Sequence, residues 1–199
     1  MPSLIAMLAT GAIAAPAQKV LLVAEPGNFV TRGLEALGVE HERVSKGGFT
    51  GVSPFGYDLI IWGLDEDRSV LNADPSLMDA FVDSGGVFLG FRANQGDPWL
   101  PVPMRRDKAY ELGDILEPEH PIFQSPNRIG KGELANVHSG SIYDAFYDLG
   151  PGWKPLVSTG REQAWDKREA QDKGPHYGIA ELRHGKGLIV LTQMIPEYH

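Results

Sequence analysis

Arg92 stands directly after a short apolar segment and is followed closely by two amide side chains. The segment is Val87–Phe91, and the amides are Asn94 and Gln95. A guanidinium offers a planar fork of donors that matches a carboxylate or a pair of sugar hydroxyls. The spacing therefore favours a ligand-binding turn at Arg92. The structural alternative is a buried arginine that pairs with an acid of a neighbouring loop.

Polar residues also follow two other apolar segments of the same kind. Glu25 and Asn28 come after residues 19–24, and Asp65 comes after residues 57–62. In open parallel α/β sheets, ligands bind outside the carboxyl ends of the strands. We therefore expect all three residues to contact the ligand. In the structural alternative, the two acids are the ion-pair partners of the arginine.

Trp99 lies seven residues after Arg92, in a loop that contains two prolines. We expect this loop to fold back over the strand end, so that the indole can stack on a sugar ring. The alternative is that the aromatic side chains of the second half only fasten loops to the sheet. Both interpretations also apply to Tyr143, Phe146, Tyr147, Trp153 and Trp165.

A second group that could carry chemistry contains two histidines and a glutamate. Glu133, His138 and His176 fall in a polar part of the sequence. Placed around one point, they could act as general acid and base, or hold a metal ion. No histidine pair has helical i, i+4 spacing, so His138 and His176 are poor metal ligands, and we expect no metal or other cofactor. The alternative is that they are ordinary hydrogen-bonded histidines.

The composition excludes several kinds of chemistry. The 199 residues include no cysteine, which excludes disulfides, thiolate zinc sites and thiol nucleophiles. The net charge is −8, and no long basic stripe is present, so we expect no nucleic-acid partner. Glycine-rich phosphate-binding motifs are also absent, which argues against a nucleotide.

The first half of the sequence alternates between apolar runs and amphipathic segments. Short apolar runs rich in β-branched residues are typical of buried parallel strands. Their alternation with helical spacing predicts right-handed crossovers and a flavodoxin-like α/β fold: an open, twisted, mostly parallel sheet with helices on both faces. We expect strands at residues 19–24, 41–44, 57–62 and 87–91, and helices at residues 29–37 and 75–83.

The second half is less regular and rich in proline. Residues 92–130 are expected to form a long excursion, and further strands are expected at residues 134–137 and 156–158. Residues 177–182 and 188–192 flank a glycine-containing loop, which predicts a closing hairpin.

The segment Gly90–Asn94 resembles the strand and sharp turn of class I glutamine amidotransferase-like domains. That family presents a catalytic cysteine in a Gly-x-Cys-x-Gly motif, whereas here Arg92 takes the place of the cysteine and Asn94 that of the second glycine. The trehalose-utilisation (ThuA-like) branch, which lacks the cysteine, is more similar, because His120-Pro121 and Gly185-Lys186-Gly187 follow in the order typical of it. The resemblance implies the fold and no amidotransferase activity.

We therefore expect a domain that binds a small polar ligand, with carbohydrate as the candidate class, at the carboxyl ends of the strands. An enzyme of carbohydrate metabolism that uses the Glu133, His138 and His176 group is one alternative. A protein-interaction or homo-oligomerisation module, with the aromatic residues of the second half in its interface, is the other.

Residues 1–17 form an apolar segment that we separate from the α/β domain at residues 18–199. Ala15-Pro16-Ala17 has the small-x-small pattern of a signal-peptidase site, although no basic residue comes before Lys19. An export signal, with a periplasmic or secreted protein, is slightly favoured over a surface-lying segment of a cytoplasmic one. The stretch is too short to predict a membrane span.

Overall fold

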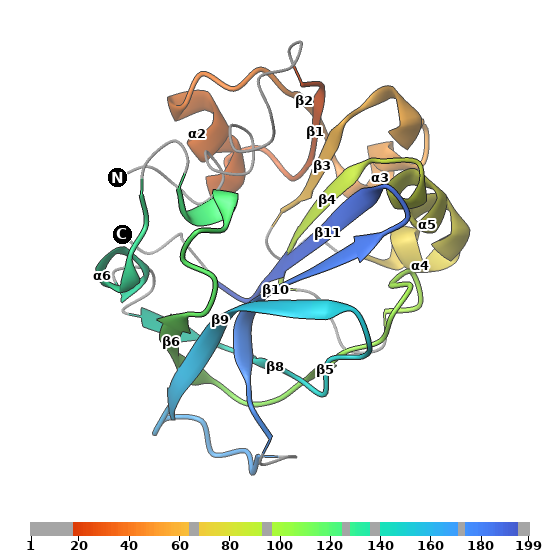
Figure 1. Ribbon diagram of the computed structural model, residues 1–199. Coiled ribbons are helices and arrows are strands. Elements are labelled where there is room, and N and C mark those ends of the chain that lie inside the picture. Colours follow the sequence, from red (N-terminus) through yellow and green to blue (C-terminus); the bar gives the residue numbers. More distant parts are fainter. Residues whose placement is uncertain are drawn as a thin grey trace.

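The short apolar runs form neighbouring inner strands in one half of a large twisted sheet (Figure 1). The computed structural model describes residues 18–63, 68–92, 97–124, 128–135, 140–170 and 174–194. Within them, eleven strands belong to one sheet, with the order β2-β1-β3-β4-β11-β10-β9-β6-β7 and with β8 attached to β10 and β5 to β8. The strands are β1 (Val20–Val23), β2 (Glu42–Val44), β3 (Leu59–Trp62), β4 (Val87–Phe91), β5 (Arg105–Arg106), β6 (Tyr110–Ile115), β7 (Ser141–Ile142), β8 (Phe146–Tyr147), β9 (Trp153–Glu162), β10 (Tyr177–His184) and β11 (Gly187–Thr192).

Strands β2, β1, β3, β4 and β11 are parallel. All residues of β1 and β3 are buried, as expected for strands covered on both faces. The other half of the sheet is antiparallel. Its antiparallel pairs are β11–β10, β10–β9, β9–β6 and β6–β7. The α/β class is therefore confirmed, but the sheet is mixed rather than mostly parallel.

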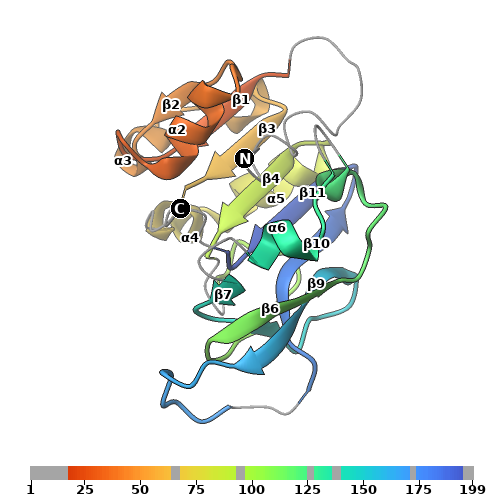
Figure 2. The ribbon, with the colours of Figure 1, turned by 90° about the vertical axis from the view of Figure 1, so that its left-hand side faces the viewer.

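Helices cover both faces of the parallel half (Figures 1 and 2). Helix α2 packs its apolar side on one face, and α3, α4 and α5 pack on the other, so each face has its own buried cluster. Asn28 caps α2 as its sequence position suggests, since its Oδ1 accepts a hydrogen bond from Val30 N at 3.0 Å. The helices are α2 (Phe29–Ala36), α3 (Lys46–Phe49), α4 (Ser69–Ala73), α5 (Pro75–Asp83) and α6 (Lys131–Ala135), with 3₁₀ turns η1 (Pro54–Gly56) and η2 (Pro121–Phe123).

The closing hairpin is confirmed as β10 and β11, which pair from Ile179–Thr192 to His184–Gly187. Gly185 occupies its turn with φ +56°, a conformation that side-chain-bearing residues adopt at a cost. None of the helices in the described ranges is long and apolar enough to cross a membrane.

Two expectations for the second half are wrong. The strand expected at residues 134–137 is absent where the structure describes it, because Leu134 lies in helix α6, whose first turn is stabilised by its own Glu133 side chain. The excursion at residues 92–130 contains an unexpected strand, β6, which pairs with β9 in the sheet. Gly113 and Asp114 interrupt the apolar alternation there, so the sequence pattern of a strand is weak.

Candidate ligand-binding site

The turn that follows β4 holds a strained residue at the carboxyl end of the parallel strands. Arg92 has φ +51°, in the left-handed region that residues other than glycine rarely occupy. Its amide donates to Thr192 O at 2.7 Å, which ties the turn to the end of β11. Backbone strain of this kind persists where the surroundings enforce it, and it concentrates at functional sites.

A buried arginine, Arg68, fixes the same turn from the start of α4. Its guanidinium donates to the carbonyl oxygen of Arg92 at 2.8 Å and to that of Phe91. Only 4% of Arg68 is exposed. The buried arginine of this region is thus Arg68, a residue that the sequence pattern did not single out, whereas Arg92 is half-buried.

The side chain of Arg92 reaches an aromatic pair from the second half of the chain. Its Cζ lies 5.4 Å from the centre of the Tyr143 ring, within the range of a cation–π contact. The Tyr143 ring meets Trp165 edge to face, with centroids 5.5 Å apart. We call these three side chains the Arg92–Tyr143–Trp165 row. Trp165 is 52% exposed, so the row ends in an indole that is open to solvent.

The turn that carries Trp165 is held firmly although the indole is exposed. Asp166 Oδ2 accepts a hydrogen bond from Ala109 N at 2.8 Å, and Gln163 N donates to Ala109 O at 2.9 Å. Hydrogen bonds from the Arg168 guanidinium hold the pKa of Asp166 far below its usual range. The Trp165 ring is therefore presented from a fixed backbone, which lowers the entropy lost when a ligand stacks on it.

Glu25 and Asn28 lie in the turn that follows β1. Glu25 is exposed, and its carbonyl oxygen accepts from Asn28 N at 3.2 Å. Besides capping α2, Asn28 packs closely on the end of the neighbouring strand: a Cβ added to Gly63 would lie 3.3 Å from Asn28 Nδ2. The turn after β1 therefore contacts the end of β3 at Gly63, at the same end of the parallel strands as Arg92.

The other predicted ligand contacts fall in two groups. Trp99 is only 1% exposed and packs against Phe88 of β4 with ring centroids 4.7 Å apart, so its ring is part of the core on the α3–α5 face. The expectation for Trp99 is therefore wrong, because its ring lies in the core beneath the sheet and not over the strand end. Of the other aromatic residues, Phe146, Tyr147 and Trp153 are buried as well. Asp65, Asn94, Gln95 and His138 lie outside the described residues.

Glu133 and His176 take part in separate structures. Glu133 Oε2 accepts from Gly130 N at 2.8 Å at the start of α6, and this backbone donor lowers the pKa of the carboxyl group. His176 instead lies beside Asp107, with Nε2 and Oδ2 3.1 Å apart. Across the described ranges, no three His, Asp or Glu side chains are grouped so that they could hold a metal ion.

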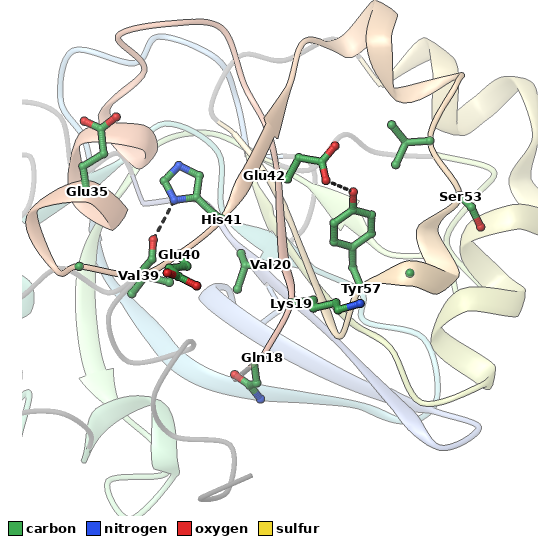
Figure 3. A pocket seen from close by; sticks show the side chains of 13 residues that line it. Gln18, Lys19, Val20, Glu35, Val39, Glu40, His41, Glu42, Ser53 and Tyr57 are labelled. Atoms are coloured by element: carbon green, nitrogen blue, oxygen red, sulfur yellow. Dashed lines mark hydrogen bonds between the residues drawn. The ribbon is translucent and has the colours of Figure 1, made fainter. Parts of the chain in front are cut away.

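A large hollow of about 1240 Å³ opens at the opposite end of the parallel strands, near the starts of β1 and β3 (Figure 3). Tyr57 donates its hydroxyl to Glu42 Oε2 at 2.5 Å there, and this bond raises the pKa of Tyr57. His41 Nδ1 lies 2.9 Å from Val39 O. Ligands of open α/β sheets bind at the carboxyl ends of the strands, so size alone does not make this hollow the candidate site.

Solved structures share the fold at low sequence identity. A cytoplasmic protein from Salmonella typhimurium matches 89% of this chain and 87% of its own, with a TM-score of 0.52 and 10% identity. A β-galactosidase from Rahnella sp. R3 matches 92% of this chain with a TM-score of 0.51 and 13% identity, and the match spans 29% of the enzyme. Neither a family model nor a curated protein matches the sequence. These likenesses show the fold alone.

Proposed function

We propose that this chain is a flavodoxin-like, class I glutamine amidotransferase-like domain of the trehalose-utilisation branch that has no amidotransferase activity. It binds a small polar ligand, carbohydrate in class, at the turn after β4. The strained backbone of Arg92 is the observation that carries the proposal. An arginine occupies a backbone conformation that glycine would adopt at a lower energy, which is consistent with a functional need for the Arg92 side chain at this position.

The Arg92–Tyr143–Trp165 row supports carbohydrate as the ligand class. A sugar ring has an apolar C–H face, which stacks on an indole, and a rim of hydroxyls, which accept hydrogen bonds from a guanidinium. The row offers both features, with the exposed Trp165 ring at one end and Arg92 at the other. The similarity in fold to part of a β-galactosidase is weaker support for the same class.

Binding rather than catalysis is the role that Arg92 itself can fill. A guanidinium stays protonated at all physiological pH values, so it neither attacks a substrate nor accepts a proton from it. The amidotransferase reaction requires a thiol, and the sequence has none. Arg92 therefore orients a ligand at the position where the amidotransferase-like domains that this sequence resembles carry a nucleophile.

Isothermal titration calorimetry with a panel of neutral sugars, uronic acids and small organic acids tests this proposal. We expect heat of binding from at least one sugar, and a loss of about two- to thirteenfold in affinity for Trp165→Ala, since an aromatic contact contributes about 0.5–1.5 kcal/mol. Arg92→Ala should weaken binding of the same ligand. Phe55→Ala is the matched control, because Phe55 is an equally exposed aromatic residue on η1.

The proposal is wrong if no ligand of the panel releases heat with the wild-type protein. It is equally wrong if a ligand binds with the same affinity to the wild type, Trp165→Ala and Arg92→Ala. A loss of affinity in Phe55→Ala alone would move the site to a different surface.

A further inference from the structure

A second hollow, of about 1050 Å³, lies on the antiparallel half of the sheet. It runs along β9 and is closed on one side by the chain on either side of Pro175. We call it the β9 groove. The ionisable residues of its lining are Lys108, Tyr110, Glu162, Arg168, Glu169, His176 and Tyr177.

His176 and Asp107 form a buried pair at this groove. Nε2 of the imidazole lies 3.1 Å from Oδ2 of the carboxylate, and only 7% of His176 and 4% of Asp107 are exposed. The imidazole lies close to the rings of Tyr110 and Tyr147, with centroids 4.7 and 5.3 Å from its own. Two aromatic rings and one carboxylate therefore fix the orientation of His176.

This geometry determines which nitrogen of the neutral imidazole can act as a base. Because Nε2 faces the Asp107 carboxylate, Nε2 carries the proton and Nδ1 keeps its lone pair. Nδ1 makes no hydrogen bond within the described part of the chain. His176 lines the β9 groove, so a molecule in the groove can supply the missing donor. An oriented imidazole with a free lone pair is the usual form of a general base.

Tyr110 does not compete for this role. Burial, together with the charges of Asp107 and Glu162, raises the pKa of Tyr110 to about 12. The phenol therefore stays protonated at neutral pH and donates its hydroxyl to the Asp107 carboxylate, which leaves Nε2 of His176 as a second donor to the same group.

Lys108 places a cation in the same groove. Its ammonium contacts Glu162 Oε2 at 2.7 Å, and its side chain is 8% exposed. An ammonium held in a largely dry environment stabilises negative charge that develops on a substrate oxygen. The β9 groove thus contains a base and a group that can stabilise an oxyanion.

The remaining groups limit the substrate class. The nearby hydroxyls are engaged, since Ser158 Oγ accepts from Asp114 N at 2.8 Å and Thr159 Oγ1 donates to His176 O at 3.2 Å. Water is therefore the nucleophile that the base can activate. The lining contains two cations, Lys108 and Arg168, and two carboxylates, Glu162 and Glu169, so their charges balance and a neutral substrate fits best. A carboxylic ester meets both conditions and needs no metal ion.

We propose that Asp107 and His176 act as a general-base pair for the hydrolysis of a small neutral O-acyl ester in the β9 groove. His176 Nδ1 takes a proton from water as the water oxygen bonds to the acyl carbon, and Lys108 stabilises the resulting oxyanion. The bond between the acyl carbon and the alkoxy oxygen then breaks, and the leaving oxygen takes the proton from His176. Ester and water yield a carboxylic acid and an alcohol. The proposal uses no residue of the Arg92 site.

Hydrolysis of p-nitrophenyl acetate and p-nitrophenyl butyrate by the purified full chain tests this inference. We expect saturable hydrolysis by the wild type and a fall of at least about 100-fold in kcat for His176→Gln, the size of a general-base contribution. His184→Ala is the matched control. His184 lies at the far end of β10 and pairs with the half-exposed Asp79 of α5, so this variant should retain the wild-type rate.

Asp107→Asn separates a catalytic from a structural role. The amide is nearly isosteric with the carboxylate, but it donates to Nε2 and so moves the ring proton to Nδ1, where it blocks the base. We expect kcat to fall while KM and the circular dichroism spectrum stay near those of the wild type. Absence of saturable hydrolysis in the wild type overturns the proposal. Equal kcat values for the folded wild type and Asp107→Asn, or for the wild type and His176→Gln, overturn it as well.

Discussion

Comparing the stability of Arg92→Gly with that of Arg92→Ala tests whether the backbone at this position is strained. Glycine relieves such strain, and alanine retains it. Both variants lose the guanidinium and its cation–π contact with Tyr143, which is worth about 0.5–1 kcal/mol at a partly exposed site. They differ only in the backbone. At φ +51°, alanine incurs a steric cost of about 1–2 kcal/mol that glycine avoids.

A second effect opposes this difference and decides its size. Glycine has more conformational freedom in the unfolded chain, which costs about 0.5–1 kcal/mol relative to alanine. The balance favours Arg92→Gly over Arg92→Ala by about 0.5–1 kcal/mol in the free energy of unfolding. Ser84 has φ −72° and therefore no steric cost, so Ser84→Ala should be more stable than Ser84→Gly by a similar amount. The sign of the difference should reverse between the two positions.

Urea unfolding at 25 °C, followed by tryptophan fluorescence, measures these differences. The slopes of the free energy against urea concentration should agree among the four variants, so that midpoints report stability alone. If Arg92→Ala is as stable as Arg92→Gly or more stable, as at Ser84, the turn after β4 stores no strain. Backbone strain at Arg92 would then give no support to a ligand-binding site at this turn.

Gly187→Ala should lower the free energy of unfolding by about 2–3 kcal/mol, because the added Cβ would lie 2.2 Å from a carbonyl oxygen of α5 and such overpacking is destabilising. Thermal unfolding measures this effect, and an unchanged midpoint would contradict it. A hydrogen bond from His120 holds the pKa of Glu181 below its usual range. The Glu181 carboxylate therefore stabilises the fold at pH values above its unfolded pKa of about 4.3. This stabilisation is lost as the pH falls through the lower pKa of the folded state. Glu181→Gln should therefore reduce the loss of stability between about pH 5 and pH 3 in urea titrations, and an identical loss would count against the pair. Asp166→Ala should speed hydrogen exchange of the Ala109 amide, which loses its acceptor at a cost of about 1–3 kcal/mol, and unchanged protection would show that the turn is held by other contacts.

The parallel strands could be predicted because their signal is local. Residues 20–23, 59–62 and 87–91 are short apolar runs between turns, and each forms a strand. Strand β6 was missed because burial on one side of an irregular strand leaves no clear alternation. Helix α6 was mistaken for a strand because it has five residues, too few to show a helical period.

The candidate sites depend on contacts that no local spacing reveals. His176 and Asp107 are 69 residues apart, and Arg68 is 24 residues from the Arg92 carbonyl that it binds. The sequence pattern identified Arg92 and His176 as residues with chemical potential, but it could not assign their partners. Their neighbours are determined by the packing of segments that are distant in the chain. Such packing leaves no periodic pattern of residue types from which it could be predicted in a single sequence.

Strand β11 has a consequence for how the molecule is assembled. It lies between β4 and β10, and it pairs Leu188 with Val87, about one hundred residues earlier in the chain. During synthesis, β4 therefore has an open edge until the ribosome has released residues 187–192, whereas β10 ends at His184, directly before β11. Such late closure of a distant pairing slows folding and leaves edges that other chains can join. Chaperones would be most needed in the interval before β11 is inserted.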